Sequence, residues 1–103
     1  PELMPMFEML ESLEYDGKRL SEYRFLVVGQ VCVSKHYRGM GIFDAIYQAY
    51  REVHSPEFEM VVTEINAMNG RSLRAHERVG FQEIARYEAE DGQIWCIVVW
   101  DWR

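Results

Sequence analysis

The sequence has 103 residues, which is enough for one globular domain with a modest core and too few for two. It is 49% hydrophobic and 14% aromatic, which excludes a disordered chain, and no apolar run reaches the length of a membrane span. The net charge of −6 argues against a nucleic-acid partner, because phosphate backbones are bound by dense positive charge. The same acidic balance suits a cationic substrate.

The first half of the chain predicts a helix followed by a central strand. Residues 2–15 carry apolar side chains at helical spacing with glutamates between them, which predicts an amphipathic helix ended by Asp16-Gly17. Residues 23–33 are β-branched and apolar on both faces, which is typical of a strand inside a sheet. Gly29 within this strand indicates a bulge or the close approach of a ligand.

The second half predicts a crossover unit, a short helix and a hairpin. Residues 41–54 have the apolar stripe of a helix and residues 59–65 form a short strand, so the two flanking strands are expected to be parallel. Residues 70–79 form a helix between the cap Asn69 and the stop Gly80. Residues 82–89 and 93–102 predict an antiparallel hairpin turned at Asp91-Gly92. The fold class is therefore α+β with a mixed sheet.

The two cysteines predict buried thiols and no metal site. Cys32 and Cys96 lie in apolar strands, and neither has a second Cys or a His at the spacing of metal ligands. The sequence also shows no signal-peptide pattern, so we expect free thiols in the reducing cytoplasm.

The loop that leads into the helix at residue 41 has the features of an anion site. It joins a strand to a helix N-terminus, where free backbone N–H groups and the helix dipole favour phosphate, and Gly39 and Gly41 allow a close backbone approach. Two nucleotide motifs fail here, because Ile42 and Phe43 replace the Lys-Ser/Thr of a P-loop and Asp44 replaces the third glycine of the dinucleotide fingerprint. A plain glycine-containing turn is the alternative interpretation.

A second segment helps to decide between these interpretations of the loop. It lies at residues 69–81 and reads Asn-Gly-Arg-Ser-Leu-Arg-Ala-His-Glu-Arg-Val-Gly-Phe. Together the two segments resemble the GNAT superfamily of acyl-CoA-dependent N-acetyltransferases. The acyl-CoA loop of that family matches Arg38, Gly39, Met40, Gly41, Ile42 and Phe43. The later family motif matches Asn69, His76, Gly80 and Phe81. Phe43 stands at a position that is small in the family, and His76 stands where many relatives have Tyr.

The resemblance covers about residues 24–103, which correspond to the C-terminal half of the family fold, whereas the N-terminal half has no counterpart. It implies a single, partial N-acyltransferase domain over residues 1–103, with the N-terminal helix at 2–15 and the cofactor-binding half at 23–103. It implies acetyl-CoA as co-substrate, with its pyrophosphate on the loop at 38–43. The groups implied to contact its pantetheine arm are the backbones of Val31 and Val33 and the side chains of Asn69 and Ser72.

Two residues are candidates for proton transfer. Glu64 interrupts an apolar run near the end of its strand and is the candidate base that takes a proton from the amine. His76 is the candidate acid for the departing thiolate. The alternatives are an ion pair of Glu64 with Arg71 or Arg74, a core or capping role for His76, and helix-start roles for Asn69 and Ser72.

The sequence therefore predicts an enzyme that moves an acetyl group directly from acetyl-CoA to a primary amine of a small molecule or a peptide. A non-catalytic acyl-CoA-binding or protein-interaction module is the alternative from another class. A homodimer is a third expectation, because the strand at 23–33 lacks the antiparallel neighbour that it has in the family.

Overall fold

The computed structural model describes residue 10, residues 12–28 and residues 41–103. The described part contains a four-stranded sheet in the order β3-β4-β6-β5 and a separate two-stranded hairpin of β1 and β2. The strands are β1 (Glu14–Tyr15), β2 (Lys18–Arg19), β3 (Phe25–Val27), β4 (Met60–Asn66), β5 (Gln82–Glu88) and β6 (Ile94–Asp101). The helices are the short 3-10 helix η1 (Leu20–Glu22) and the α-helices α2 (Ile42–His54) and α3 (Gly70–Val79).

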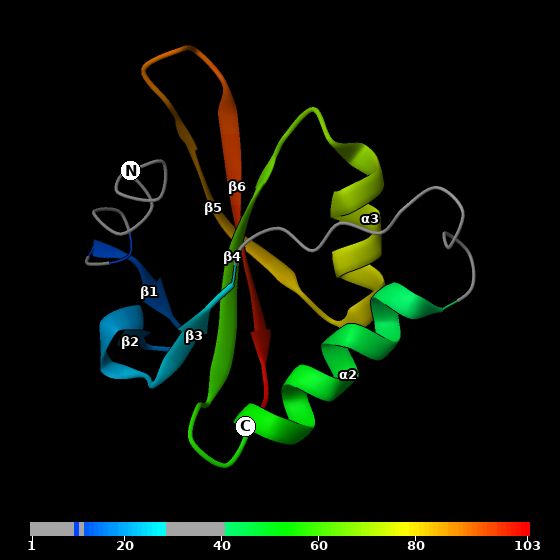
Figure 1. Cartoon of the computed structure of the whole chain (residues 1–103). Coiled ribbons are helices and arrows are strands. Elements are labelled where there is room, and N and C mark those ends of the chain that lie inside the picture. The colour runs from blue at the N-terminus through cyan, green and yellow to red at the C-terminus, as the bar shows by residue number, and fades with distance from the viewer. Residues whose placement is uncertain (1–9, 11, 29–40) are drawn as a thin grey trace.

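The four-stranded sheet is mixed, as the sequence predicts. β3 and β4 are parallel, and Phe25 lies opposite Met60. β6 lies between β4 and β5 and is antiparallel to both, so the last hairpin inserts its second strand into the sheet. Helices α2 and α3 cover one face, whereas β1, β2 and η1 lie on the other (Figure 1). The result is a three-layer α+β fold with a crossover helix and a C-terminal antiparallel hairpin.

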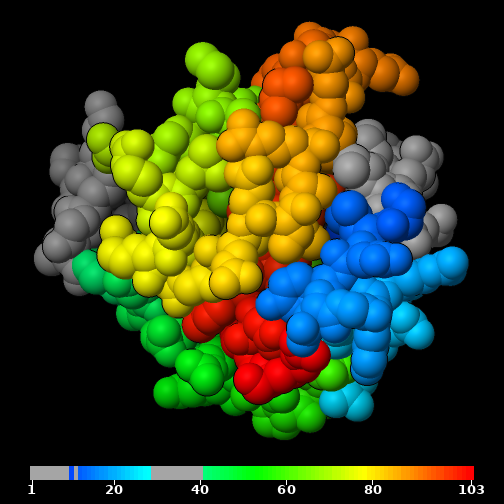
Figure 2. Space-filling model, turned by 180° about the vertical axis from the view of Figure 1, so that it is seen from behind, coloured from blue at the N-terminus to red at the C-terminus, as the bar shows by residue number. Residues whose placement is uncertain are grey.

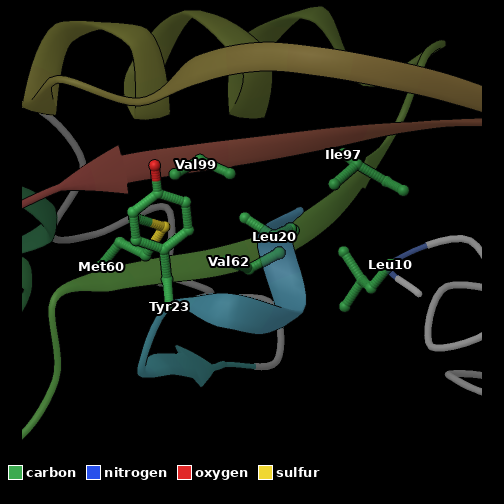
Figure 3. Packing of buried hydrophobic residues seen from close by; sticks show 7 residues of the cluster. All are labelled: Leu10, Leu20, Tyr23, Met60, Val62, Ile97 and Val99. Carbon is green, nitrogen blue, oxygen red and sulfur yellow. The ribbon is translucent and has the colours of Figure 1, made fainter. Parts of the chain in front are cut away.

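Each face of the sheet carries its own core, because the side chains of β4 alternate between the faces. Met60 and Val62 point to the layer of β1, β2 and η1, whereas Val61 and Ile65 point to the helices. Figure 3 shows the first cluster, in which the buried Leu10, Leu20 and Tyr23 lie against β4 and β6. The second cluster contains Val28, Tyr47, Val61, Ile65, Phe81, Val98 and Trp100. The two apolar faces explain why β4 and β6 read as continuous hydrophobic runs.

One end of the predicted helix at 2–15 is wrong. Glu14 and Tyr15 form β1 and pair with Arg19 and Lys18. Asp16 and Gly17 have φ values of 50° and 84°, and two successive residues with positive φ make a tight hairpin turn. Leu10 and Ser12 are helical, as predicted, whereas residues 1–9 and 11 of that prediction lie outside the described residues.

The predicted strand at 23–33 is present only in part among the described residues. β3 begins at Phe25, because Tyr23 ends η1 and its amide donates to the carbonyl of Leu20 over 3.0 Å. Residues 29–33, with the predicted bulge at Gly29, lie outside the described residues.

At the opposite edge of the sheet, β5 has only β6 as a partner among the described strands. Figure 2, seen from behind, shows β5 on the surface between α3 and the β1–β2 hairpin.

Candidate active site

Gly41 forms the N-terminal cap of α2. Its φ of 74° lies in the left-handed region, which favours glycine, and its carbonyl accepts the amide of Ala45 over 2.9 Å. A Cβ built at Gly41 would meet no atom within 4 Å, so the backbone conformation rather than crowding within the described chain selects glycine here. The other residues of the predicted loop, Arg38, Gly39 and Met40, lie outside the described residues, as do Val31 and Val33.

The first turn of α2 directs Phe43 into the space between the two helices. Its ring meets the imidazole of His76 edge to face, with centroids 4.9 Å apart, and the ring of Tyr47 with centroids 5.1 Å apart. Ile42 is half-buried beside it. The large side chain at the position that is small in the family thus packs against α3.

His76 is fully enclosed between α2 and α3. It is 1% exposed, and the rings of Phe43, Tyr47 and Phe81 surround it. Its Nδ1 lies 2.8 Å from the carbonyl oxygen of Ser72, and its Nε2 lies 2.8 Å from the hydroxyl of Tyr47. A carbonyl oxygen only accepts, so Nδ1 carries the proton and Nε2 accepts the hydrogen of Tyr47.

Burial sets the protonation of this pair. Removal from water lowers the pKa of His76 below its usual value, and the bond to the carbonyl of Ser72 opposes that effect only in part. Burial also raises the pKa of Tyr47 far above that of a free phenol. His76 is therefore a neutral imidazole and Tyr47 a neutral phenol. A further polar neighbour, the Ser72 hydroxyl, lies 3.3 Å from Nδ1.

The ends of α3 follow the local rules that the sequence indicates. The Asn69 side chain accepts the amide of Ser72 over 3.1 Å, which is an N-cap, so its helix-start interpretation is confirmed. Gly80 has a φ of 131°, and a Cβ at this position would lie 2.8 Å from Nε1 of Trp100. Gly80 therefore ends the helix and lets the chain pass close to Trp100, after which Phe81 enters the core.

Glu64 lies on β4 on the other side of the sheet. It is opposite Ile97 and shares the face of Met60 and Val62, and it is 8% exposed. The hydroxyl of Tyr87 on β5 donates a hydrogen bond to its Oε2. Arg71 and Arg74 belong to α3, which covers the opposite face of the sheet, so the structure does not support the alternative ion pair with either arginine.

The structure thus separates the two predicted proton-transfer residues. Glu64 lies on the face of β1, β2 and η1, and His76 lies on the face of α2 and α3. The described pairing of β3 with β4 ends just before Glu64 in the sequence of β4. Val28 donates its amide to the carbonyl of Val62 over 3.1 Å, and the Thr63 hydroxyl donates to the carbonyl of Val28 over 2.8 Å.

Sequence reasoning missed the partners of both residues. Tyr47 reads as one member of the apolar stripe of α2, and Tyr87 as one residue of an edge strand. The one sequence feature that could indicate a special role for either tyrosine is its hydroxyl group, which stands among apolar residues in α2 and in an alternating polar and apolar sequence in β5. A buried hydroxyl needs a hydrogen-bond partner, but the sequence does not show which residue supplies it.

A shallow hollow lies between the end of β4 and the β5–β6 turn, but none of its lining residues is titratable. Across residues 10, 12–28 and 41–103, no three His, Cys, Asp or Glu side chains come together in a way that would hold a metal ion.

The Cys96 thiol is buried, which raises its pKa, and Cys32 lies outside the described residues. No helix in the described ranges has the length and apolar character of a membrane span.

Comparison with solved structures defines the class of the fold. The chain has the fold of the GNAT acetyltransferases, as the two sequence motifs predict, and it spans about half the length of the structures that it matches. No family model matches the sequence, and no curated protein matches it.

Three of the similar structures carry informative names. Nourseothricin acetyltransferase has a TM-score of 0.71 at 20% identity, with 80% of this chain and 52% of that chain covered. NAA60 of Arabidopsis thaliana, in complex with a bisubstrate analogue, has a TM-score of 0.69 at 19% identity, with 91% and 56% covered. The NatC complex bound to Gag peptide and CoA has a TM-score of 0.61 at 19% identity, with 73% and 49% covered. At these identities the likeness concerns the fold.

Proposed function

We propose that the chain is the cofactor-binding half of an N-acetyltransferase that moves an acetyl group from acetyl-CoA to a primary amine of a small molecule or a peptide. The observation that carries the proposal is the position of Gly41. The second glycine of the acyl-CoA loop motif is the left-handed cap of α2, so free amides of the first helical turn point toward the end of that loop. The named neighbours, of which one holds CoA and another a bisubstrate analogue, support the choice of cofactor.

In this proposal the two substrates approach from opposite faces of the sheet and meet where the described pairing of β3 with β4 ends, next to Glu64. The pyrophosphate of acetyl-CoA binds at residues 38–43. Its pantetheine arm contacts the backbones of Val31 and Val33 and the side chains of Asn69 and Ser72, of which the last two belong to the start of α3. The amine approaches on the side of Glu64. Glu64 takes a proton from the ammonium, and the neutral amine then attacks the thioester carbonyl carbon. The carbon–sulfur bond breaks, and no covalent enzyme intermediate is needed because a thioester is already activated.

His76 is the proposed source of the proton for the CoA thiolate. Its neutral state in the structure sets a condition, because the ring must first take up a proton to act as an acid. A thiolate that develops beside the Ser72 hydroxyl supplies the negative charge that raises the pKa of a nearby imidazole. The acidic composition of the chain suits a cationic amine, and the cytoplasm is the proposed compartment.

Calorimetric titration with acetyl-CoA tests the cofactor site. Gly41→Glu places a negative charge at the cap of α2 and forces a side chain into a left-handed conformation, so we expect binding to weaken by at least about tenfold, or about 1.4 kcal/mol. Gly92→Glu is the matched control. Gly92 also has a positive φ, 86°, and also has no atom within 4 Å of a built Cβ, but it lies in the β5–β6 turn. Absence of binding by the folded wild type, or equal loss in both variants, contradicts the proposal.

A non-catalytic acyl-CoA-binding or protein-interaction module is the second candidate. The observation that favours it is His76, whose two ring nitrogens both hold hydrogen bonds inside the protein. A screen of small-molecule and peptide amines separates the two functions. Acetyl-CoA binding with no release of free CoA across the screen favours the module. Transfer that Glu64→Gln lowers by about a hundredfold or more supports the enzyme.

A further inference from the structure

Tyr87 reaches Glu64 across a whole strand. In the sheet, Glu64 and Ala85 both lie opposite Ile97, whereas Tyr87 lies opposite Trp95, two residue pairs further on. Two neighbouring strands are about 4.8 Å apart, so the backbones of β4 and β5 are about 10 Å apart. Only a long side chain lying over β6 spans this distance. Tyr87 does so on the face of the first core cluster, against which its ring packs.

In this contact Tyr87 is the donor and Glu64 is the acceptor. Burial, followed by the hydrogen bond to the Glu64 carboxylate and its charge, raises the pKa of Tyr87, so the phenol keeps its proton and acts as the donor. Glu64 is almost completely removed from water. A buried carboxylate needs donors to its charged form, and a donor that is held by packing also fixes the direction in which the carboxylate points.

We propose that Tyr87 is a positioning residue for Glu64, holding one carboxylate oxygen so that the group is ionised and aimed for proton transfer. This inference rests on the proposed function, in which Glu64 is the base. Tyr87 acts from β5, two strands away from Glu64 in the sheet, and on the face opposite the proposed cofactor site. Its loss is therefore expected to change the base and to leave acetyl-CoA binding intact.

The chain contains a matched control for this contact. The Tyr15 hydroxyl donates to Oδ2 of Asp101 over 3.1 Å, also a phenol–carboxylate bond on the same face of the sheet. Asp101 lies opposite Met60, at the other end of β4 from Glu64. Tyr15→Phe and Tyr87→Phe each remove one hydroxyl from such a bond, and only the second touches the proposed base.

The decisive measurement is a titration of the Glu64 carboxyl carbon by NMR in protein with ¹³C-labelled glutamate, with Glu64→Gln used to assign the signal. In Tyr87→Phe the charged carboxylate loses the hydrogen bond that Tyr87 donates, so we expect the midpoint to move to higher pH by about one unit. Tyr15→Phe is expected to leave the midpoint unchanged. An unchanged midpoint in Tyr87→Phe, with the fold intact, overturns the proposal.

Two further readouts keep this inference separate from the proposed function. In Tyr87→Phe we expect acetyl-CoA affinity equal to that of the wild type, kcat lower by about tenfold at neutral pH, and the acidic limb of kcat/KM moved to higher pH. A shifted NMR midpoint in a protein that transfers no acetyl group to any amine overturns the enzyme proposal. An active enzyme whose kcat and pH profile ignore Tyr87→Phe overturns the positioning role.

Discussion

The buried imidazole of His76 shows how one residue can carry two interpretations. Its ring joins α2 to α3 through Tyr47 and closes a bond within α3 through the carbonyl of Ser72. In the neutral form Nε2 accepts the hydrogen of Tyr47, whereas a cationic ring has no acceptor for that hydrogen. A core role and an acid role therefore make opposite demands on the same proton.

The neutral state of His76 predicts a pH-dependent stability. Because its pKa is lower in the folded chain than in the unfolded one, the unfolded chain binds the extra proton as the pH falls below about 6.5. We expect the free energy of unfolding to decrease from about pH 7.5 to about pH 5.5 and to level off below the folded pKa. Urea denaturation at a series of pH values measures this slope.

His76→Gln removes the titrating group, and we expect a flatter slope for it. Asp101 does not interfere in this window. Its pKa is lowered from an ordinary 3.8, first by hydrogen bonding to Arg103, so its contribution is lost only at lower pH. An equal slope in His76→Gln and the wild type contradicts the assignment.

At the residue scale, the sequence predicts what local rules decide. Asn69 as a cap and Gly80 as a stop follow from the few residues on either side of them. The partners of His76 and Glu64 do not, because Tyr47 and Tyr87 are 29 and 23 residues away along the chain. To predict the face of the sheet on which each candidate lies, one must also know the register of β4 with β6 and the packing of the helices.

At the element scale, the pairing of β3 with β4 depends on a side chain as well as on the backbone. Residues Phe25 to Val27 pair in register, Val28 donates to Val62, and the Thr63 hydroxyl then donates to the carbonyl of Val28. Thr63 is 1% exposed, so this hydroxyl serves a carbonyl that is buried with it. The bond ties the two parallel strands at the point between the two proposed substrate faces.

Thr63→Val tests this tie, because valine has nearly the same shape and no hydroxyl. The carbonyl of Val28 loses the bond that Thr63 donates, and we expect the free energy of unfolding to fall by about 1 to 3 kcal/mol. Thr63→Ser keeps the donor and is expected to lose less stability than Thr63→Val. Urea denaturation compares the two variants. A valine variant as stable as the wild type shows that the bond contributes nothing.

The sequence predicts α2, β4, α3, β5 and β6 within about one residue, since each has a clear period and marked ends. It fails at β1, and the dipeptide Asp-Gly shows why. Asp91-Gly92 turns a hairpin as predicted. The sequence predicts that Asp16-Gly17 ends a helix, but this dipeptide turns the hairpin of β1 and β2. The apolar spacing before Asp16 fits a helix, but pairing with Lys18 and Arg19 decides the local structure.

At the scale of the whole molecule, the layer of β1, β2 and η1 protects the face that carries Glu64. Leu20 of η1 is fully buried against Met60, Val62 and Ile97 (Figure 3). Arg103 ties the same layer to the end of β6, because its guanidinium binds Asp16 over 2.8 Å and Asp101 over 2.7 Å. These ion pairs are partly exposed, so the apolar contacts of the layer are expected to contribute more to stability.

Leu20→Ala measures how firmly this layer is held. The substitution removes a fully buried side chain and leaves a cavity between η1 and the sheet, so we expect a loss of about 2 to 5 kcal/mol in the free energy of unfolding. Val53→Ala is the control. Val53 is 68% exposed on α2, and its truncation is expected to change stability by less than about 0.5 kcal/mol. Both values come from urea denaturation under one set of conditions. Equal, small effects of the two substitutions mean that the sheet and its helices are stable without the third layer, and that the face of Glu64 is not protected by it.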